Sequence, residues 1–216
     1  MAEVIAGFYG KLPARGDFVR GGLPRGFVDP WDAWVAPAIA GSRVQMGDDW
    51  LPAFLESPVW RFTLAPGLCG AWAVLGLMLP SVDRAGRYFP LTFAALFDDV
   101  AVNDTAWLDG CEAAGRAALE QDAGPEQIAA MVGHPAVLST AAGETAPLQS
   151  IWWTDGAPRV PPTRLVISGM PNACVYATML GAAADANPAA AAAETITERD
   201  AVPGTPTGGT PWETPS

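Results

Sequence analysis

Three short apolar segments between residues 58 and 97 place the tightest constraint on the fold. They are rich in aromatic and branched side chains and are separated by turns that contain Pro or Gly. Connections this short favour an antiparallel meander over parallel crossovers. Within them, Ala73–Leu79 and Leu91–Phe97 are apolar without strict alternation, so we expect helices to cover both faces of the sheet. The segments are residues 59–64, 72–79 and 88–97.

The rest of the pattern predicts an α/β (α+β) domain, a three-layer sandwich whose central sheet is mainly antiparallel or mixed. An apolar run from Val4 to Tyr9 predicts a first strand. A helix is expected to begin at Asp29-Pro30, because aspartate can cap exposed N–H groups and proline suits the first helical position. Further helices are expected over 48–56, 107–119, from Gly124-Pro125 onward and over 172–183, with further strands over 149–154 and 164–168.

Composition divides the chain near residue 183. Residues 1–183 are predicted to form one domain with a sizeable core, because half of the chain is hydrophobic. After residue 183 come alanine repeats and then Thr, Pro and Gly, without hydrophobic periodicity. Residues 184–216 are therefore predicted to be a flexible tail.

The tryptophans are predicted to fill the core, because they recur at positions expected to face it. Adjacent residues on a strand point to opposite faces of a sheet. Trp152 and Trp153 can therefore both be buried only if both faces are covered.

Charge and hydropathy argue against two classes of partner. The formal net charge is −11, and residues 91–216 hold four basic and fifteen acidic side chains. An acidic surface repels phosphate backbones, so no nucleic-acid partner is expected. The longest nearly charge-free apolar stretch, residues 70–80, is far shorter than the roughly 20 residues that cross a bilayer. With no signal peptide evident, we expect no membrane insertion and a cytoplasmic location.

Metal, cofactor and catalytic signals are sparse. Cys69, Cys111 and Cys174 are widely spaced, and His134 is the only histidine, so a tetrahedral metal site is not expected. The glycines before Lys11 do not form a phosphate-binding loop, because Leu12 follows the lysine where that loop needs Ser or Thr. No cofactor and no enzymatic activity are predicted.

Two charged turns remain as candidate sites. One carries Lys11, Arg15, Asp17 and Arg20, and the other carries Asp83, Arg84 and Arg87. These side chains either form salt bridges that tie the two loops together or contact a protein partner, and the two interpretations are compatible.

Several blocks of sequence form one ordered pattern along the chain. It opens with GFYGKLP at 7–13, followed by RGDFVR at 15–20. Further blocks are FVDPWDAW at 27–34, SPVWRF at 57–62, LPSVDRAGRYFPLT at 79–92 and IWWT at 151–154. These blocks resemble the TagF family of type VI secretion accessory proteins, and they occur in family order, which makes the match far more specific than any single short motif.

The resemblance implies a regulator that represses assembly or firing of the type VI apparatus post-translationally, in some systems through the forkhead-associated protein Fha. Two alternatives stay open. The first is an accessory protein that promotes assembly, and the second is a hydrolase in which His134 serves as base for a serine such as Ser139 or Ser81, although no G-x-S-x-G elbow is present.

Overall fold

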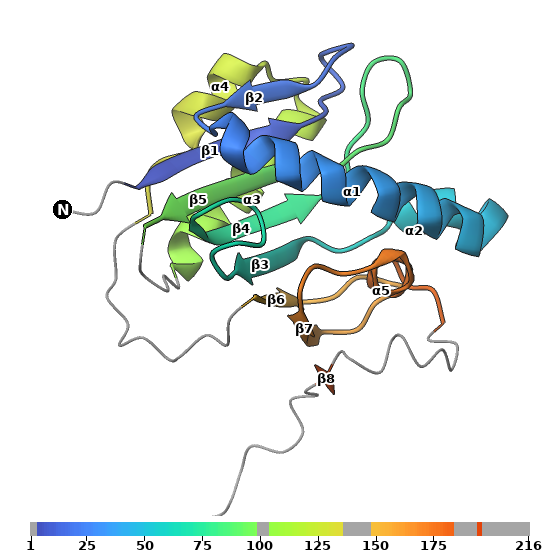
Figure 1. The fold of residues 1–216 in the computed structure, drawn as a ribbon. Coiled ribbons are helices and arrows are strands. Elements are labelled where there is room, and N and C mark those ends of the chain that lie inside the picture. Colours follow the sequence, from blue (N-terminus) through green and yellow to red (C-terminus); the bar gives the residue numbers. More distant parts are fainter. Residues whose placement is uncertain (1–3, 99–103, 136–147, 184–193, 196–216) are drawn as a thin grey trace, which may run out of the picture.

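The computed structural model describes residues 4–98, 104–135, 148–183 and 194–195. Within these residues the chain forms an eight-stranded sheet with the strand order β2-β1-β5-β4-β3-β6-β7-β8, and every neighbouring pair is antiparallel (Figure 1). The expected meander is present at its centre as β3, β4 and β5. The strands are β1 Ile5–Gly10, β2 Val19–Gly21, β3 Trp60–Leu64, β4 Ala73–Leu79, β5 Leu91–Phe97, β6 Gln149–Thr154, β7 Thr163–Ser168 and β8 Glu194–Thr195.

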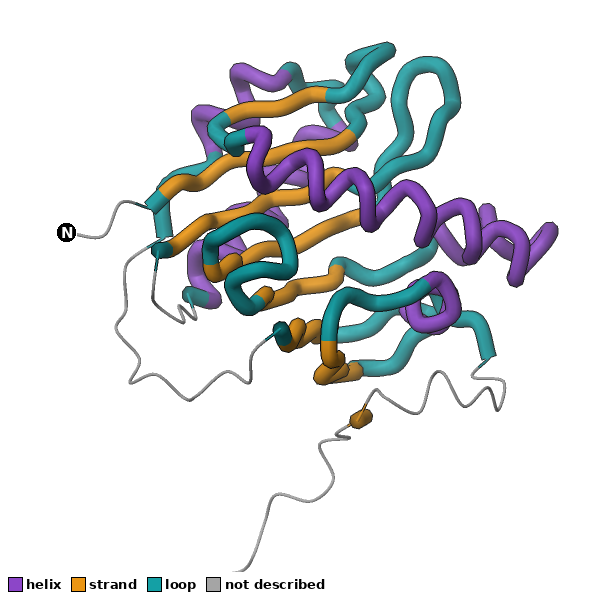
Figure 2. Tube along the Cα trace, in the orientation of Figure 1, coloured by secondary structure: helices purple, strands orange, loops and turns teal. Residues whose placement is uncertain are grey.

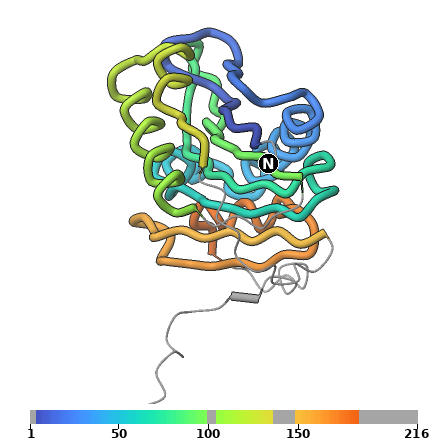
Figure 3. The backbone as a smooth tube through the Cα atoms, turned by 90° about the vertical axis from the view of Figure 1, so that its left-hand side faces the viewer, coloured from blue at the N-terminus to red at the C-terminus, as the bar shows by residue number. Residues whose placement is uncertain are grey.

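Helices cover both faces of the sheet, as the continuous apolar strands predict. Figure 3 shows α3 and α4 on one side of the strands and α1 on the other, and Figure 2 shows α1 running across the strands. Each face has its own hydrophobic cluster, and residues of β4 and β5 enter the two clusters alternately. The helices are α1 Arg25–Met46, α2 Trp50–Leu55, α3 Thr105–Glu120, α4 Pro125–Met131 and α5 Ala173–Met179, with a 3-10 turn over Gly47–Asp49.

Stacked aromatic rings fix α1 to the sheet. The ring of Trp31 lies 4.9 Å from that of Phe62 on β3 and 6.3 Å from that of Trp152 on β6, centroid to centroid. The indole N–H of Trp31 also donates to the hydroxyl of Thr92 on β5, at 3.2 Å. Aromatic pairs in such offset contacts contribute free energy beyond that of the area they bury. The stack joins α1 to β3 and β6, and the hydrogen bond joins it to β5.

The adjacent tryptophans lie on opposite faces of β6. Trp152 is fully buried in the cluster under α1, and Trp153 packs against the cluster under α3 and α4. The prediction made from their adjacency is therefore confirmed.

The predicted start of α1 is wrong by about one turn. The helix begins at Arg25, with Pro24 as its N-cap, and Asp29 and Pro30 lie inside it. The additional turn buries Phe27 and Val28 on the same stripe as Trp31. Burying two such side chains gains about 1.5–3 kcal/mol each, which outweighs the roughly 3 kcal/mol that a proline costs inside a helix.

Two strands have no counterpart in the sequence prediction. β2 is only three residues long and pairs with β1, and β8 pairs with Leu165 and Val166 of β7. β8 falls within the predicted tail, whose other residues lie outside the described residues. The division into a domain and a tail remains a prediction.

A glycine under the aromatic stack should be intolerant of substitution. A Cβ atom at Gly76 would lie 2.5 Å from the carbonyl oxygen of Phe93 and 2.6 Å from Cζ of Phe62. We expect Gly76→Ala to destabilise the fold by about 1–3 kcal/mol through overpacking. Urea unfolding measures the change.

The control is Gly110→Ala in α3, where nothing lies within 4 Å of the added Cβ. This variant should be neutral or more stable by about 0.5–1 kcal/mol, because alanine favours a helix over glycine. Equal effects of the two substitutions would contradict the packing described here.

Candidate functional site

Two loops meet at one end of the sheet because of the strand register. Tyr9 near the end of β1 pairs with Thr92 of β5, and Leu79 at the end of β4 pairs with Leu91. The loop that follows β1 and the loop that joins β4 to β5 therefore emerge side by side (Figure 1). We call residues 11–20 and 80–90 together the loop pair.

A buried ion pair lies at the centre of the loop pair. The ammonium group of Lys11 donates to Oδ2 of Asp83, and the Asp83 side chain is fully buried. Oδ1 of Asp83 accepts from the backbone N–H groups of Ala85 and Arg87, each at 2.9 Å, and Oδ2 accepts from Nε of Arg87 at 2.7 Å. The carboxylate thus has donors on both oxygens.

The environment of Asp83 decides its charge. Burial raises the pKa of a carboxyl, but the hydrogen bonds from Lys11, Arg87 and Ala85 outweigh burial and hold the pKa of Asp83 well below its usual range. Asp83 is therefore ionised at neutral pH.

Further hydrogen bonds to backbone carbonyls join the two loops. The Arg84 N–H donates to the carbonyl of Arg15 at 2.9 Å, and the Ser81 hydroxyl donates to the carbonyl of Lys11 at 2.6 Å. The guanidinium group of Arg87 donates to the carbonyl of Gly16. The ion pairs and cross-links expected from the structural interpretation of these turns are present.

The candidate residues differ in exposure. Lys11 and Asp83 are buried, so their side chains offer little surface to a partner. The others are exposed, and Arg87 keeps 56% of its side chain accessible although it is bonded to Asp83. The exposed set is Arg15, Asp17, Arg20, Arg84 and Arg87. Their role in binding a partner remains a prediction.

Phe18 is a residue of the loop pair that the sequence did not single out. Its ring stacks on Tyr9 at 5.3 Å, meets Phe89 edge-on at 4.8 Å and has the Lys11 ammonium 4.4 Å from its centroid. It nevertheless remains 45% exposed. The sequence signal that could have identified it is an aromatic residue directly after Asp17, among the charged residues of the turn.

A second charged cluster lies between the sheet and α3. Arg61 of β3 donates to Asp109 at 2.8 Å and to Glu112 at 3.1 Å, both on α3, and Glu112 also pairs with Arg116. Burial lowers the pKa of Arg61, but the hydrogen bond that it donates to Glu112 and the nearby carboxylates raise it overall. Asp155 also lies 3.9 Å from Arg61, so three carboxylates surround two guanidinium groups. Such an ion-pair network is typical of contacts that hold a helix to a sheet.

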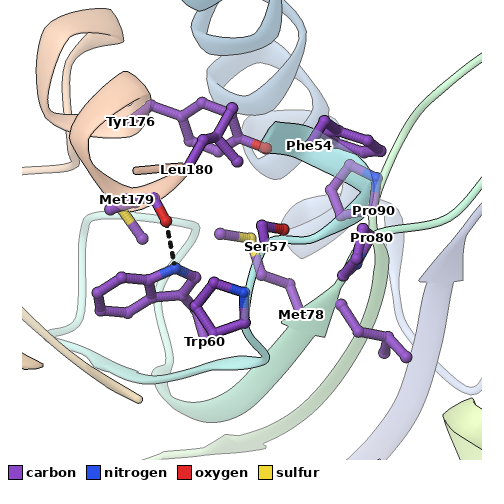
Figure 4. Close-up of a pocket in the computed structure, with 11 residues that line it drawn as sticks. Phe54, Ser57, Trp60, Met78, Pro80, Pro90, Tyr176, Met179 and Leu180 are labelled. Carbon is purple, nitrogen blue, oxygen red and sulfur yellow. Dashed lines mark hydrogen bonds between the residues drawn. The ribbon is translucent and has the colours of Figure 1, made fainter. Parts of the chain in front are cut away.

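A small apolar pocket lies between α2, α5 and the ends of β3 and β4 (Figure 4). The indole N–H of Trp60 donates to the carbonyl of Met179 on one side of it, at 3.0 Å. The interior volume is about 10 Å³, room for one water molecule at most. A substrate or cofactor does not fit there.

The residues of the hydrolase alternative are not assembled in the described part of the chain. His134 is exposed, and no described residue forms a hydrogen bond or ion pair with it. The hydroxyl of Ser81 is buried and bonded to the Lys11 carbonyl, and Ser139 lies outside the described residues. The described residues also contain no group of three or more His, Cys, Asp or Glu side chains placed to hold a metal ion. None of their helices is long and apolar enough to span a bilayer.

The chain is thus an α+β domain with a charged loop pair at one end of its sheet, and known proteins share features with it. The TagF N-terminal domain family, described as type VI secretion system-associated, matches residues 7–134. The crystal structure of PA0076 from Pseudomonas aeruginosa PAO1 is similar, with a TM-score of 0.74 and 34% sequence identity over 93% of this chain and 100% of that one. Comparison with curated protein sequences gives no match.

The chain therefore belongs to the TagF family, and it is a type VI secretion accessory protein. The resemblance read from the sequence blocks is confirmed, and so is the fold class.

The charge state of Asp83 makes the stability of the loop pair dependent on pH. Because its folded pKa is depressed, the carboxylate stabilises the fold above its unfolded pKa of about 3.9, and this contribution is lost as pH falls toward the folded value. We expect Asp83→Asn to lower the unfolding midpoint clearly at pH 7, and the difference from the wild type to narrow below about pH 4.

Thermal unfolding across a pH series measures both effects. Asp17→Asn is the control, because its side chain is fully exposed and lies 3.8 Å from Arg87. It should leave the midpoint almost unchanged at every pH. A pH-independent difference between Asp83→Asn and the wild type would show that the charge of Asp83 does not stabilise the fold.

Proposed function

We propose that this chain is a cytoplasmic, non-enzymatic regulator that represses type VI secretion post-translationally by binding a secretion component, such as the forkhead-associated protein Fha. The observation that carries the proposal is the loop pair, in which exposed arginines project from a base held by the Lys11–Asp83 ion pair. Loops that a rigid scaffold positions in this way are where proteins carry their contacts.

The proposed mechanism is occupancy. A regulator that binds the inactive state of its partner more tightly than the active state shifts the partner toward inactivity without any covalent chemistry. Such a mechanism requires a preorganised surface and no catalytic group, and the loop pair supplies such a surface.

The alternative functions differ in their effect on secretion in the cell and in their need for His134. An assembly-promoting accessory protein would be needed for secretion, whereas a repressor limits it. A hydrolase would depend on His134, which a repressor that works by occupancy does not need.

Deletion of the gene should raise type VI secretion in its own host, and expression of the wild-type chain should lower it again. His134→Ala should restore repression as well as the wild type does, because its exposed side chain has no bonded partner among the described residues. The measurement is the amount of protein secreted through the apparatus, together with a pull-down from the same cells that identifies the bound component.

Reduced secretion after deletion would contradict repression and favour the assembly-promoting role. Loss of repression in a folded His134→Ala protein would favour the hydrolase.

A further inference from the structure

The charge of the loop pair is opposite to that of the rest of the chain. The loop pair holds five basic and two acidic side chains, whereas all other residues together hold seven basic and twenty-one acidic ones. Its formal charge is therefore +3 in a chain whose net charge is −11. A local positive region on an acidic protein attracts an acidic partner to one place and repels it elsewhere.

Part of this charge is available to a partner. The side chains of Arg15, Arg20 and Arg84 form no hydrogen bond or ion pair with any described residue. The backbones of Arg15 and Arg84 are also adjacent, because the backbone N–H of Arg84 donates to the Arg15 carbonyl at 2.9 Å. Guanidinium groups bind carboxylate or phosphate oxygens with two parallel hydrogen bonds, so two exposed arginines that start from adjacent backbone positions are suited to the anionic groups of one partner segment.

An apolar contact lies in the same loop pair. Phe18 is partly exposed, yet Tyr9, Phe89 and the Lys11 ammonium hold its ring in place. A fixed, accessible aromatic ring loses little conformational entropy on binding and is typical of residues that dominate interface energetics.

We propose that the loop pair binds an acidic protein segment whose carboxylate or phosphate groups contact Arg15 and Arg84 and whose neighbouring apolar side chain packs on Phe18. This inference rests on the proposed function only for the identity of the partner. A protein segment fits better than an anionic membrane or a nucleic acid, because those extended surfaces would also meet the acidic remainder of the chain.

Synthetic peptides test the proposal directly on the full chain. The probe is a fluorescent peptide of glutamates around one phenylalanine. A second peptide has glutamines in place of the glutamates and therefore carries no side-chain charge. A third peptide has phosphothreonines among the glutamines, and it separates recognition of phosphate from recognition of carboxylate. Anisotropy should show salt-sensitive binding of an anionic peptide and much weaker binding of the glutamine peptide.

Substitutions then locate the site. Arg15→Glu combined with Arg84→Glu should weaken binding about tenfold or more, because two exposed charge contacts become repulsive. Phe18→Ala should weaken it about fivefold. Arg164→Glu is the matched control, since Arg164 is an exposed arginine on β7 without a bonded partner among the described residues, and it should leave binding unchanged. Unfolding midpoints show that each variant is folded.

Three results of the binding experiments would overturn the proposal. They are equal binding of the charged and glutamine peptides, unchanged binding by a folded Arg15/Arg84 double variant, and binding of anionic lipid vesicles without binding of either anionic peptide. Repression of secretion by the double variant at the wild-type level would refute this binding mode while leaving the proposed function intact. Failure of the wild type to repress would instead refute the proposed function.

Discussion

The buried contact between Lys11 and Asp83 is the interaction on which the rest of the candidate site depends. It joins two loops whose residues are 72 positions apart in the chain, and both charged groups are removed from water. A buried charge is tolerated only when it is paired and hydrogen-bonded, and Asp83 meets this condition through Lys11, Arg87 and Ala85. Each loop therefore supplies groups that stabilise the conformation of the other.

The sheet supplies the rigidity that this contact needs. Both faces of β4 and β5 are buried, one under α1 and the other under α3, so these strands are fixed from two sides. The loops that follow β1 and β4 begin at residues whose positions are set by the pairing of these two strands with β5. The charged end of the molecule is thus carried by a sheet with a hydrophobic core on each face. One backbone hydrogen bond between the loops fixes Arg15 and Arg84 relative to each other.

The features predictable from sequence were those set by local patterns. The unbroken apolar runs at 73–79 and 91–97 predicted a sheet covered on both faces, and the Gly124-Pro125 signal predicted where α4 begins. The helix expected over 172–183 is present as α5, which is shorter and ends at Met179. The start of α1 was mispredicted, because the gain from burying Phe27 depends on tertiary packing that no cap residue encodes. The charged turns were identified from residue type, but the division between buried Lys11 and exposed Arg15 follows from the position of the loop that carries Asp83, which is distant in sequence. Phe18 and the Arg61 network went unrecognised for the same reason.

Family membership establishes the secretion system in which the chain acts, and the geometry of the loop pair indicates where a partner would bind. The most direct test of that claim is amide hydrogen exchange of the full chain, alone and in complex with the component captured from its own cells. The account predicts slower exchange concentrated in residues 11–20 and 80–90, with little change in α1 and α2. Protection of α1 and α2 or of the β7 edge, with exchange in the loop pair unchanged, would contradict it.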